Sequence, residues 1–392
     1  MNLKSKIFFI TLVLSIYSCS SREGSVSTIS VNGSKMSVVS LNSIKSDTAT
    51  IPLSSLVEDC TLVQLETRDD AFFKSWFTTV TEKYIGVRDN QSEPYKLFDR
   101  SGKFLCNVGS RGQGPGEYSL TPYDDIIDDQ NELIYLAPFL GDKILVYNTS
   151  GQFLKNIVSP QRMLKAKIFL SNDTLTVIYM PYNDVEVMSV QFNVNTGEVL
   201  KKLPTLSHFI VMDADGEIFN TRNTPETFDF LFTNSDTLYH FDVTNNKILP
   251  VFLMTSNTSE NAPKQSFQLN KDLFLTNVYS WRINPEAGGQ GLIYKGTIAT
   301  DLKTGTASYI KIVNDYYGNL PVSASVVTFR NGYFVYNIQP EQLIDDIENR
   351  LTESSCTEDD RQVLQKTLSI LKEGTNNLVF IGKLREEWNI KW

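Results

Sequence analysis

The sequence has very few histidines, and it lacks the short motifs of the common hydrolases. Its 392 residues include two histidines, His208 and His240, so a metal centre built from several histidines cannot form. It contains no Gly-x-Ser-x-Gly turn, no Cys-x-x-Cys pair and no His-Glu-x-x-His helix. Those patterns carry the commonest nucleophiles and metal ligands of hydrolases. Their absence favours a protein that is not an enzyme and needs no cofactor.

Runs of basic residues are missing as well. The chain has 36 Lys and Arg residues against 45 Asp and Glu residues, which gives a net charge of −9. Proteins that bind nucleic acid use basic patches to neutralise phosphates. The charge balance therefore argues against a nucleic-acid partner.

A long apolar run occurs only at the N-terminus. Two lysines precede the apolar stretch from Ile7 to Ile16, and the sequence Ile16-Tyr17-Ser18-Cys19 follows. This pattern is typical of an export signal, and its end resembles a bacterial lipobox. We therefore expect a signal peptide over residues 1–18, a lipid on Cys19, and a location in the bacterial cell envelope, on the periplasmic or the cell-surface side.

Residues that follow the signal are rich in Ser, Thr, Asn and Gly, which predicts a flexible tether over residues 19–50 with at most one short strand. The folded domain is then expected over residues 51–392. It contains three cysteines, Cys60, Cys106 and Cys356. Because the count is odd, they cannot all pair, and the sequence leaves their pairing open.

The folded part repeats one unit. Residues 95–108 and 144–158 each consist of an alternating apolar strand, a polar turn with glycine, and a second alternating strand, and looser copies follow. The turn residues are separated by 49, 46, 49 and 59 positions; they are Gly102, Gly151, Gly197, Asn246 and Gly305. Alternation around such turns is typical of β-hairpins, and the period suits a four-stranded propeller blade. Five blades are identified in this way.

Both ends of the domain supply a sixth blade. Residues 326–329, 333–338 and 378–384 give three strands, and residues 61–65 give the fourth. Strands from both termini would close the ring and leave no long unpaired edge. The prediction is an all-β protein: a six-bladed β-propeller of four-stranded blades, closed by N- and C-terminal strands.

Residues 340–374 do not fit a blade. Leu343, Ile347 and Leu351 recur at helical spacing, and so do the apolar residues between Val363 and Leu371. Thr357 with Asp360 resembles a capping box, and Gly374 is a plausible helix stop. We expect a helical hairpin inserted between the second and third strands of the last blade.

A glycine-rich loop, VGSRGQGPGEYS, spans residues 108–119. It lacks the Gly-Lys-Ser/Thr ending of a P-loop, and a strand rather than a helix follows it, so a nucleotide site is not expected. In a propeller this loop crosses from the rim of the first blade to the centre of the second. Glu117 and Arg111 are expected either to pin the loop or to reach the channel.

The residues Phe98-Asp99-x-x-Gly102-Lys103-Phe104, with Gly112-Gln113-Gly114-Pro115-Gly116-Glu117-Tyr118 after them, resemble the motif of the bacterial six-bladed β-propeller lipoproteins, relatives of the NHL-repeat propellers. The resemblance covers nearly the whole mature chain. It implies a propeller fold and export, but it implies no particular activity.

Loops between the second and third strands of each blade should share one face with the crossings between blades. Aromatic and arginine side chains on such loops suit a binding site. The candidate ligand-binding residues on this long-loop face are Arg88, Tyr95, Arg111, Glu117, Tyr118, Tyr182, Arg222 and Arg282. No catalytic residue is assigned.

Acidic residues allow an alternative. Lactonase-like propellers hold calcium in the central channel with carboxylate and amide oxygens. Asp213-Ala-Asp215-Gly216-Glu217 is better interpreted as a hairpin turn, and Asp124-Asp125 and Asp128-Asp129 as solvated turn residues. The leading hypothesis is a lipid-anchored, noncatalytic binding or scaffold protein for a glycan, a peptide or an envelope protein. The alternative is a calcium-dependent hydrolase or lyase, and a purely structural role is a third.

Overall fold

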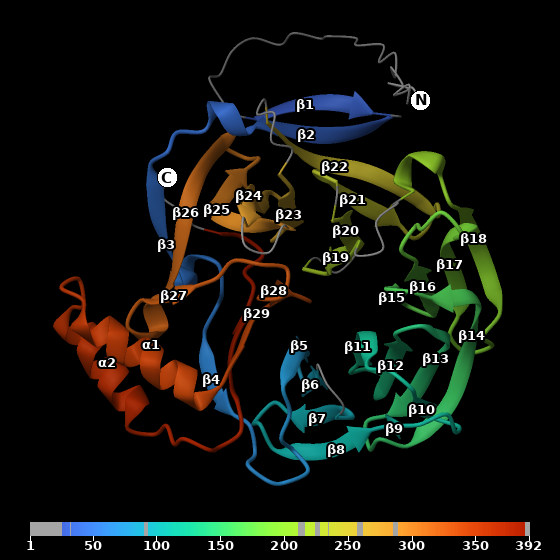
Figure 1. The fold of residues 1–392 in the computed structure, drawn as a ribbon, viewed down its shortest axis with the longest axis horizontal. Coiled ribbons are helices and arrows are strands. Elements are labelled where there is room, and N and C mark those ends of the chain that lie inside the picture. The colour runs from blue at the N-terminus through green and yellow to red at the C-terminus, as the bar shows by residue number, and fades with distance from the viewer. Residues whose placement is uncertain are drawn as a thin grey trace.

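Six blades form a ring around a common centre in the computed structural model (Figure 1), which describes residues 26–31, 33–89, 93–210, 216–223, 228–233, 235–256, 262–284 and 289–388. Each blade has its first strand at the centre and its fourth at the rim. The six-bladed propeller predicted from the hairpin repeat is confirmed. The signal peptide and Cys19 lie outside the described residues, as do Asp213 to Asp215.

Blades 1 to 3 contain four antiparallel strands each. Blade 1 consists of β5 (Ser75–Val80), β6 (Tyr84–Asp89), β7 (Tyr95–Asp99) and β8 (Phe104–Val108). Blade 2 consists of β11 (Pro122–Asp128), β12 (Leu133–Pro138), β13 (Gly141–Asn148) and β14 (Phe153–Met163). Blade 3 consists of β15 (Lys167–Ser171), β16 (Thr174–Ile178), β17 (Val187–Asn193) and β18 (Val199–Pro204).

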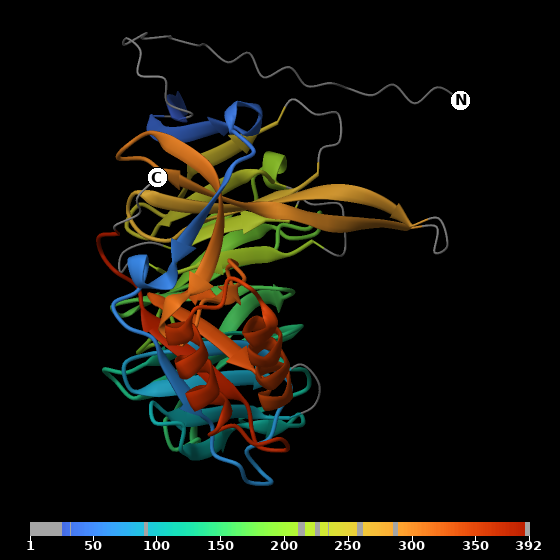
Figure 2. The same ribbon diagram turned by 90° about the vertical axis from the view of Figure 1, so that its left-hand side faces the viewer.

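Blades 4 and 5 carry additional strands. Blade 4 consists of β19 (Ile218–Thr221), β20 (Phe228–Phe232), β21 (Thr237–Asp242) and β22 (Lys247–Thr255). Blade 5 consists of β23 (Lys264–Gln268), β24 (Leu273–Asn284), β25 (Gly289–Asp301) and β26 (Thr306–Asn314), with β27 (Leu320–Val322) beyond it. The long β24–β25 hairpin projects from the disc (Figure 2).

Blade 6 closes the ring as predicted. Its strand order is β28 (Phe329–Arg330), β29 (Tyr333–Ile338), β30 (Leu378–Lys383) and β4 (Thr61–Gln64). The outermost strand therefore comes from the N-terminal part of the chain and the inner three from the C-terminal part. Joining both ends in one sheet removes the open edge that either end would otherwise leave.

The hairpin turns follow from local side-chain chemistry. In the turn of blade 1, Asp99 Oδ1 accepts hydrogen bonds from the backbone N–H groups of Ser101 (2.9 Å) and Lys103 (3.1 Å). Gly102 follows with a φ of +90°, and a Cβ there would lie 2.2 Å from the carbonyl oxygen of Gln64. Asn148 repeats this arrangement in blade 2 by accepting from Ser150 and Gln152. A short polar residue followed by glycine thus specifies the turns of blades 1 and 2.

The N-terminal segment differs from the expected tether. Residues 26–52 form β1 (Val26–Val31), β2 (Ser34–Ser40) and β3 (Thr48–Pro52). β2 pairs in parallel with β22, and β3 pairs in parallel with β26, so both extend the rims of blades 4 and 5 (Figure 1). Val39 is buried there against Phe252 and Met254, and Met36 is buried as well. These strands could not be predicted from the polar composition of the segment, because its few apolar residues find partners only at the edges of blades 4 and 5.

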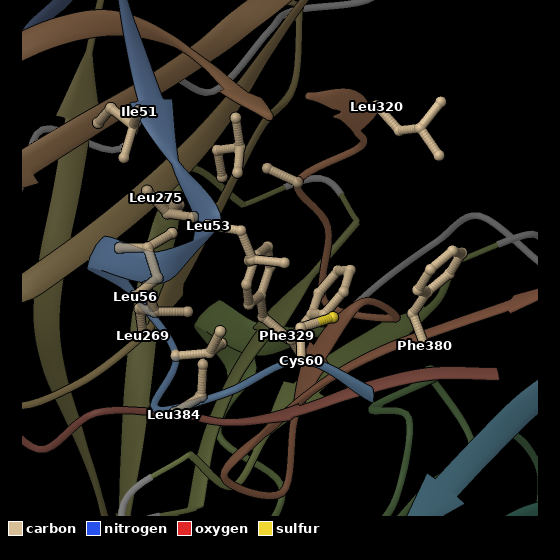
Figure 3. Packing of buried hydrophobic residues seen from close by; sticks show 14 of the residues in the cluster. Ile51, Leu53, Leu56, Cys60, Leu269, Leu275, Leu320, Phe329, Phe380 and Leu384 are labelled. Carbon is tan, nitrogen blue, oxygen red and sulfur yellow. The ribbon is translucent and has the colours of Figure 1, made fainter. Parts of the chain in front are cut away.

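Residues after β3 join the largest core cluster, between blades 5 and 6. Ile51, Leu53, Leu56 and Cys60 pack with Leu275 of blade 5 and with residues of blade 6, and the labelled side chains converge there (Figure 3). The three cysteines of the described chain are free thiols. Burial raises the pKa of Cys60 to about 12, so this thiol packs as a small apolar group.

The helical hairpin lies between β29 and β30, as predicted. It consists of α1 (Pro340–Thr352) and α2 (Glu358–Leu368), which cover the outside of blade 6 (Figures 1 and 2). The capping box of Thr357 and Asp360 is present. The predicted stop at Gly374 is wrong, because α2 ends at Leu368 and a turn then brings Leu371 into the core. Within the described residues no helix is long and apolar enough to cross a membrane.

Candidate functional site

Six charged side chains meet at the centre of the propeller. They come from blades 1, 2, 3, 4 and 6, and we call them the hub cluster: Arg88, Asp124, Asp125, Lys167, Arg222 and Arg330. Arg88 lies near the end of β6, the two aspartates lie in β11, Lys167 begins β15, Arg222 follows β19, and Arg330 ends β28. All except Arg222 are almost completely buried.

Asp124 is the hub of this cluster. Its Oδ1 accepts a hydrogen bond from Arg330 Nη2 at 2.6 Å, and its Oδ2 accepts from Arg222 Nη2 at 2.9 Å. The backbone N–H of Ile168 also donates to Oδ2, at 2.9 Å. One fully buried carboxylate thereby connects blade 2 to blades 3, 4 and 6.

Asp125 points the other way along the same strand. Side chains alternate along a β-strand, so Asp125 faces blade 1 while Asp124 faces blade 3. Tyr95 donates its hydroxyl hydrogen to Asp125 Oδ2 at 3.0 Å. Arg88 Nε lies 2.8 Å from Asp125 Oδ1, although the two groups are not aligned for a hydrogen bond. Asp124 and Asp125, which were expected to be solvated turn residues, are therefore buried ion-pair partners, because both lie within β11.

Aromatic rings cover the cluster on the long-loop side. The guanidinium carbon of Arg88 lies 4.3 Å from the centre of the Phe77 ring and 5.6 Å from that of Trp76. Lys167 Nζ lies 4.4 Å from the centre of the Tyr123 ring. The negative faces of these rings attract the cations.

The charges shift each other's ionisation. Burial acts to raise the pKa of Asp124, but Arg330, Arg222, Lys167 and Arg88 outweigh it and hold that pKa well below its usual range. Burial lowers the pKa of Lys167 to about 7, since the attraction of Asp124 is opposed by three arginines. Burial likewise lowers the pKa of Arg222 to about 10. The cluster therefore keeps Asp124 ionised and disfavours the charged form of Lys167.

Arg222 lies at the opposite mouth of the channel from the one expected. It follows β19 and precedes β20, so it belongs to the turn between the first two strands of blade 4, whereas the long loops join second and third strands. The inner strand of this blade had not been located from its sequence. Residues 224–227 of the same turn lie outside the described residues.

The other candidate residues have separate locations. Tyr95, Tyr118 and Tyr182 are buried, and Tyr118 Oη accepts from the N–H of Tyr95 (2.8 Å) and donates to the carbonyl oxygen of Val108 (2.9 Å). Arg111 is exposed, and Arg282 lies exposed on the projecting β24–β25 hairpin. These residues do not form one surface. The structure brings together Arg88 and Arg222, with Tyr95 beside them.

The glycine loop is held by its own glutamate. Glu117 Oε2 accepts from the N–H of Gly114 at 2.8 Å, and β9 (Ser110–Arg111) pairs in parallel with β10 (Glu117–Tyr118). Tyr147 of blade 2 donates to the carbonyl oxygen of Gly116 at 2.8 Å. These contacts favour the pinning interpretation of Glu117. A cavity of about 500 Å³ lies between this loop and the β12–β13 turn.

Two cavities of about 310 Å³ each lie at the channel mouths. On the long-loop side the cavity is bordered by Trp76, Tyr123 and Phe139, with Arg111 and Lys165. On the turn side it is bordered by residues from the inner strands and first turns of five blades, including Thr79, Ile127, Phe169, Arg222 and Asn331. Within the described residues, no group of three or more His, Cys, Asp or Glu side chains is arranged to hold a metal ion.

Sequence reasoning missed four members of the hub cluster: Asp124, Asp125, Lys167 and Arg330. One signal was available, since the pair Asp124-Asp125 interrupts the apolar run of Tyr123 to Ile127. Adjacent carboxylates inside a buried strand require cationic partners. Nothing local indicates which cations these are, because Arg330 is 206 residues away from Asp124 in the sequence.

Known structures with a similar fold include the crystal structure of a candidate exported protein from Bacteroides fragilis. It is 15% identical, has a TM-score of 0.58, and covers 89% of this chain and 100% of its own. A member of the DUF4221 family from Bacteroides vulgatus is 13% identical with a TM-score of 0.47, and covers 84% of this chain and 98% of its own. A search of curated proteins finds no match. Residues 36–383 match the family described as a domain of unknown function, DUF4934, and the chain belongs to this family.

Proposed function

We propose that this protein is a noncatalytic binding protein of the bacterial cell envelope, exported and held at a membrane by a lipid on Cys19. Its ligand site is the centre of the propeller. The observation that supports this function is the hub cluster, in which buried charged groups from five blades converge between two open cavities. A rigid scaffold with converging polar groups beside a cavity is the usual form of a small-molecule site.

Export is supported by the N-terminal pattern and by the similar fold of a candidate exported protein from Bacteroides fragilis. The calcium-dependent alternative gains less support from the channel. Asp124 and Asp125, the carboxylates at its centre, already face arginines. A calcium ion there would have to displace those arginines or be repelled by them.

Binding is tested by thermal unfolding of the chain from Ser20 onward with oligosaccharides, short peptides, small organic acids and calcium. A ligand present at about 100 times its Kd stabilises the folded state by about 2.7 kcal/mol. We expect at least one ligand to raise Tm in a saturable manner. Absence of any saturable shift would contradict the proposal of a small-ligand site, and a shift with calcium that a chelator reverses would favour the alternative.

The lipid anchor is tested by fractionating cells. Cys19→Ser removes the thiol that would carry the lipid, so the variant should leave the membrane fraction, while the original protein stays there. A single lipid-modified residue is the only anchor expected, because the rest of the sequence has no further long apolar run. Cys106→Ser is the matched control and should remain in the membrane fraction. Equal membrane association of both variants would show that something other than Cys19 anchors the protein.

A further inference from the structure

The hub cluster contains more positive than negative groups. Four cationic side chains, Arg88, Lys167, Arg222 and Arg330, face two carboxylates, Asp124 and Asp125. At most two positive charges are thus left without a matching carboxylate among the described residues. Burying an uncompensated charge is costly, so a cluster of this composition is electrostatically suited to receive an anion.

Hydrogen-bond donors in the cluster are also left over. Arg88 Nη2, Arg222 Nε and Arg330 Nε are buried and have no hydrogen-bond acceptor in the described part of the chain. Arg88 and Arg330 are 0% and 3% exposed, so bulk water does not satisfy these groups. Buried donors of native proteins nearly always have acceptors. These three arginine donors therefore need acceptors, and a bound ligand is suited to supply them.

The route to these donors runs through Arg222. Its side chain is 11% exposed, more than any other member of the cluster, and it borders the turn-side cavity while contacting Asp124 at 2.9 Å. The opposite side is closed by the rings of Phe77, Trp76 and Tyr123. A ligand in the turn-side cavity therefore meets Arg222, the member of the cluster that borders it, with Arg330 and Arg88 buried behind.

The remaining wall of this cavity suits the same ligand. Thr79 Oγ1 is buried without a hydrogen-bond partner in the described residues and can donate a further bond. Two acids also border the cavity, but Glu82 binds Lys383 Nζ (3.1 Å), and Asp129 accepts from Thr81 (2.7 Å) and from the N–H of Lys83 (3.2 Å). Their charges are thus already engaged at the rim.

From these observations we infer that the turn-side mouth of the channel binds a small molecule through an oxyanion group, a phosphate or a carboxylate, held by Arg222 and attracted by the charges of Arg330 and Arg88 behind it. Guanidinium groups bind such oxyanions through paired N–H donors. The cavity of about 310 Å³ limits the ligand to a small molecule or to one end of a larger one. This inference rests on the proposed binding function and specifies the chemistry of its ligand.

The test is calorimetric titration of the chain from Ser20 onward with inorganic phosphate and with citrate, in chloride of matched ionic strength. Arg222→Gln removes the accessible guanidinium, and Arg361→Gln removes an arginine of α2, on the outside of blade 6, as the matched control. We expect saturable binding of at least one anion, a Kd at least tenfold higher in Arg222→Gln, and little change in Arg361→Gln. Tighter binding of phosphate would indicate that the site recognises phosphate groups, and tighter binding of citrate would indicate that it recognises carboxylates.

A second variant guards against loss of folding. Arg222→Lys keeps the charge but loses the paired donors, so it should bind more weakly than the original protein and more tightly than Arg222→Gln. Phosphate also stabilises folded proteins nonspecifically by exclusion from their surface, so an effect that does not saturate, or that is equal in all variants, would overturn the inference. If no anion binds but a neutral sugar or peptide raises Tm, the oxyanion site is wrong and the binding function stands.

Discussion

Asp124→Asn should lower the free energy of unfolding by about 3 to 5 kcal/mol, the usual cost of removing one partner from a buried ion pair. The asparagine side chain has nearly the same shape, and its carbonyl oxygen can still accept from the N–H of Ile168. The loss of stability therefore measures the contribution of the negative charge of Asp124. Without it, Arg222 and Arg330 are buried with no carboxylate at their hydrogen-bonded contact.

Chemical denaturation monitored by circular dichroism measures this change. Asp142→Asn is the matched control, because Asp142 is exposed on β13 and should change stability by less than about 0.5 kcal/mol. A loss below about 1 kcal/mol in Asp124→Asn would mean that the arginines find other partners, and that Asp124 does not connect the blades.

Stability should rise with pH across the titration of Lys167. Its pKa in the folded protein is about 7, against 10.5 for the unperturbed group. Between these values the unfolded chain keeps a proton on Lys167 that the folded chain has released, so stability increases with pH. From pH 6 to pH 9 this group alone contributes an increase of about 2 to 3 kcal/mol.

Comparison with Lys167→Met isolates this contribution, because other titrating groups are common to both proteins. The groups that face Lys167 are Asp124 of β11, Arg88 of β6, Arg330 of β28 and Arg222 after β19. Relative to the original protein, the variant should gain more stability at pH 6 than at pH 9. Lys143→Met, at an exposed position, is the control and should show no such pH dependence. A stability difference that is the same at both pH values would show that Lys167 stays charged.

Blade architecture could be predicted because its determinants are local. The turn of each hairpin needs a polar residue such as Asp99 and a residue with positive φ such as Gly102, and both lie within a few positions of the strands they join. The capping box of Thr357 and Asp360 is equally local. The alternation of apolar and polar residues and the chemistry of the turns involve residues close together along the chain, so both can be recognised in the sequence.

The N-terminal strands and the hub cluster could not be predicted in this way. Val39 is buried because β22 lies beside it, more than 200 residues further on. Arg222 was singled out as a loop arginine, yet its position relative to Asp124 depends on how blades 2 and 4 face each other across the channel.

By itself, then, the sequence determined the hairpin repeat, the ring of six blades and the helical insertion. The repeat and the insertion follow from residues that are neighbours along the chain, and the sixth blade follows from the strand patterns that remain at the two ends of the domain. Tertiary structure alone decided where the charges meet. Arg88, Asp124, Lys167, Arg222 and Arg330 approach one another only when the ring closes and directs them to its centre. Removal from water then turns these scattered surface-type residues into strongly interacting partners, because charges interact far more strongly in the protein interior than in solvent.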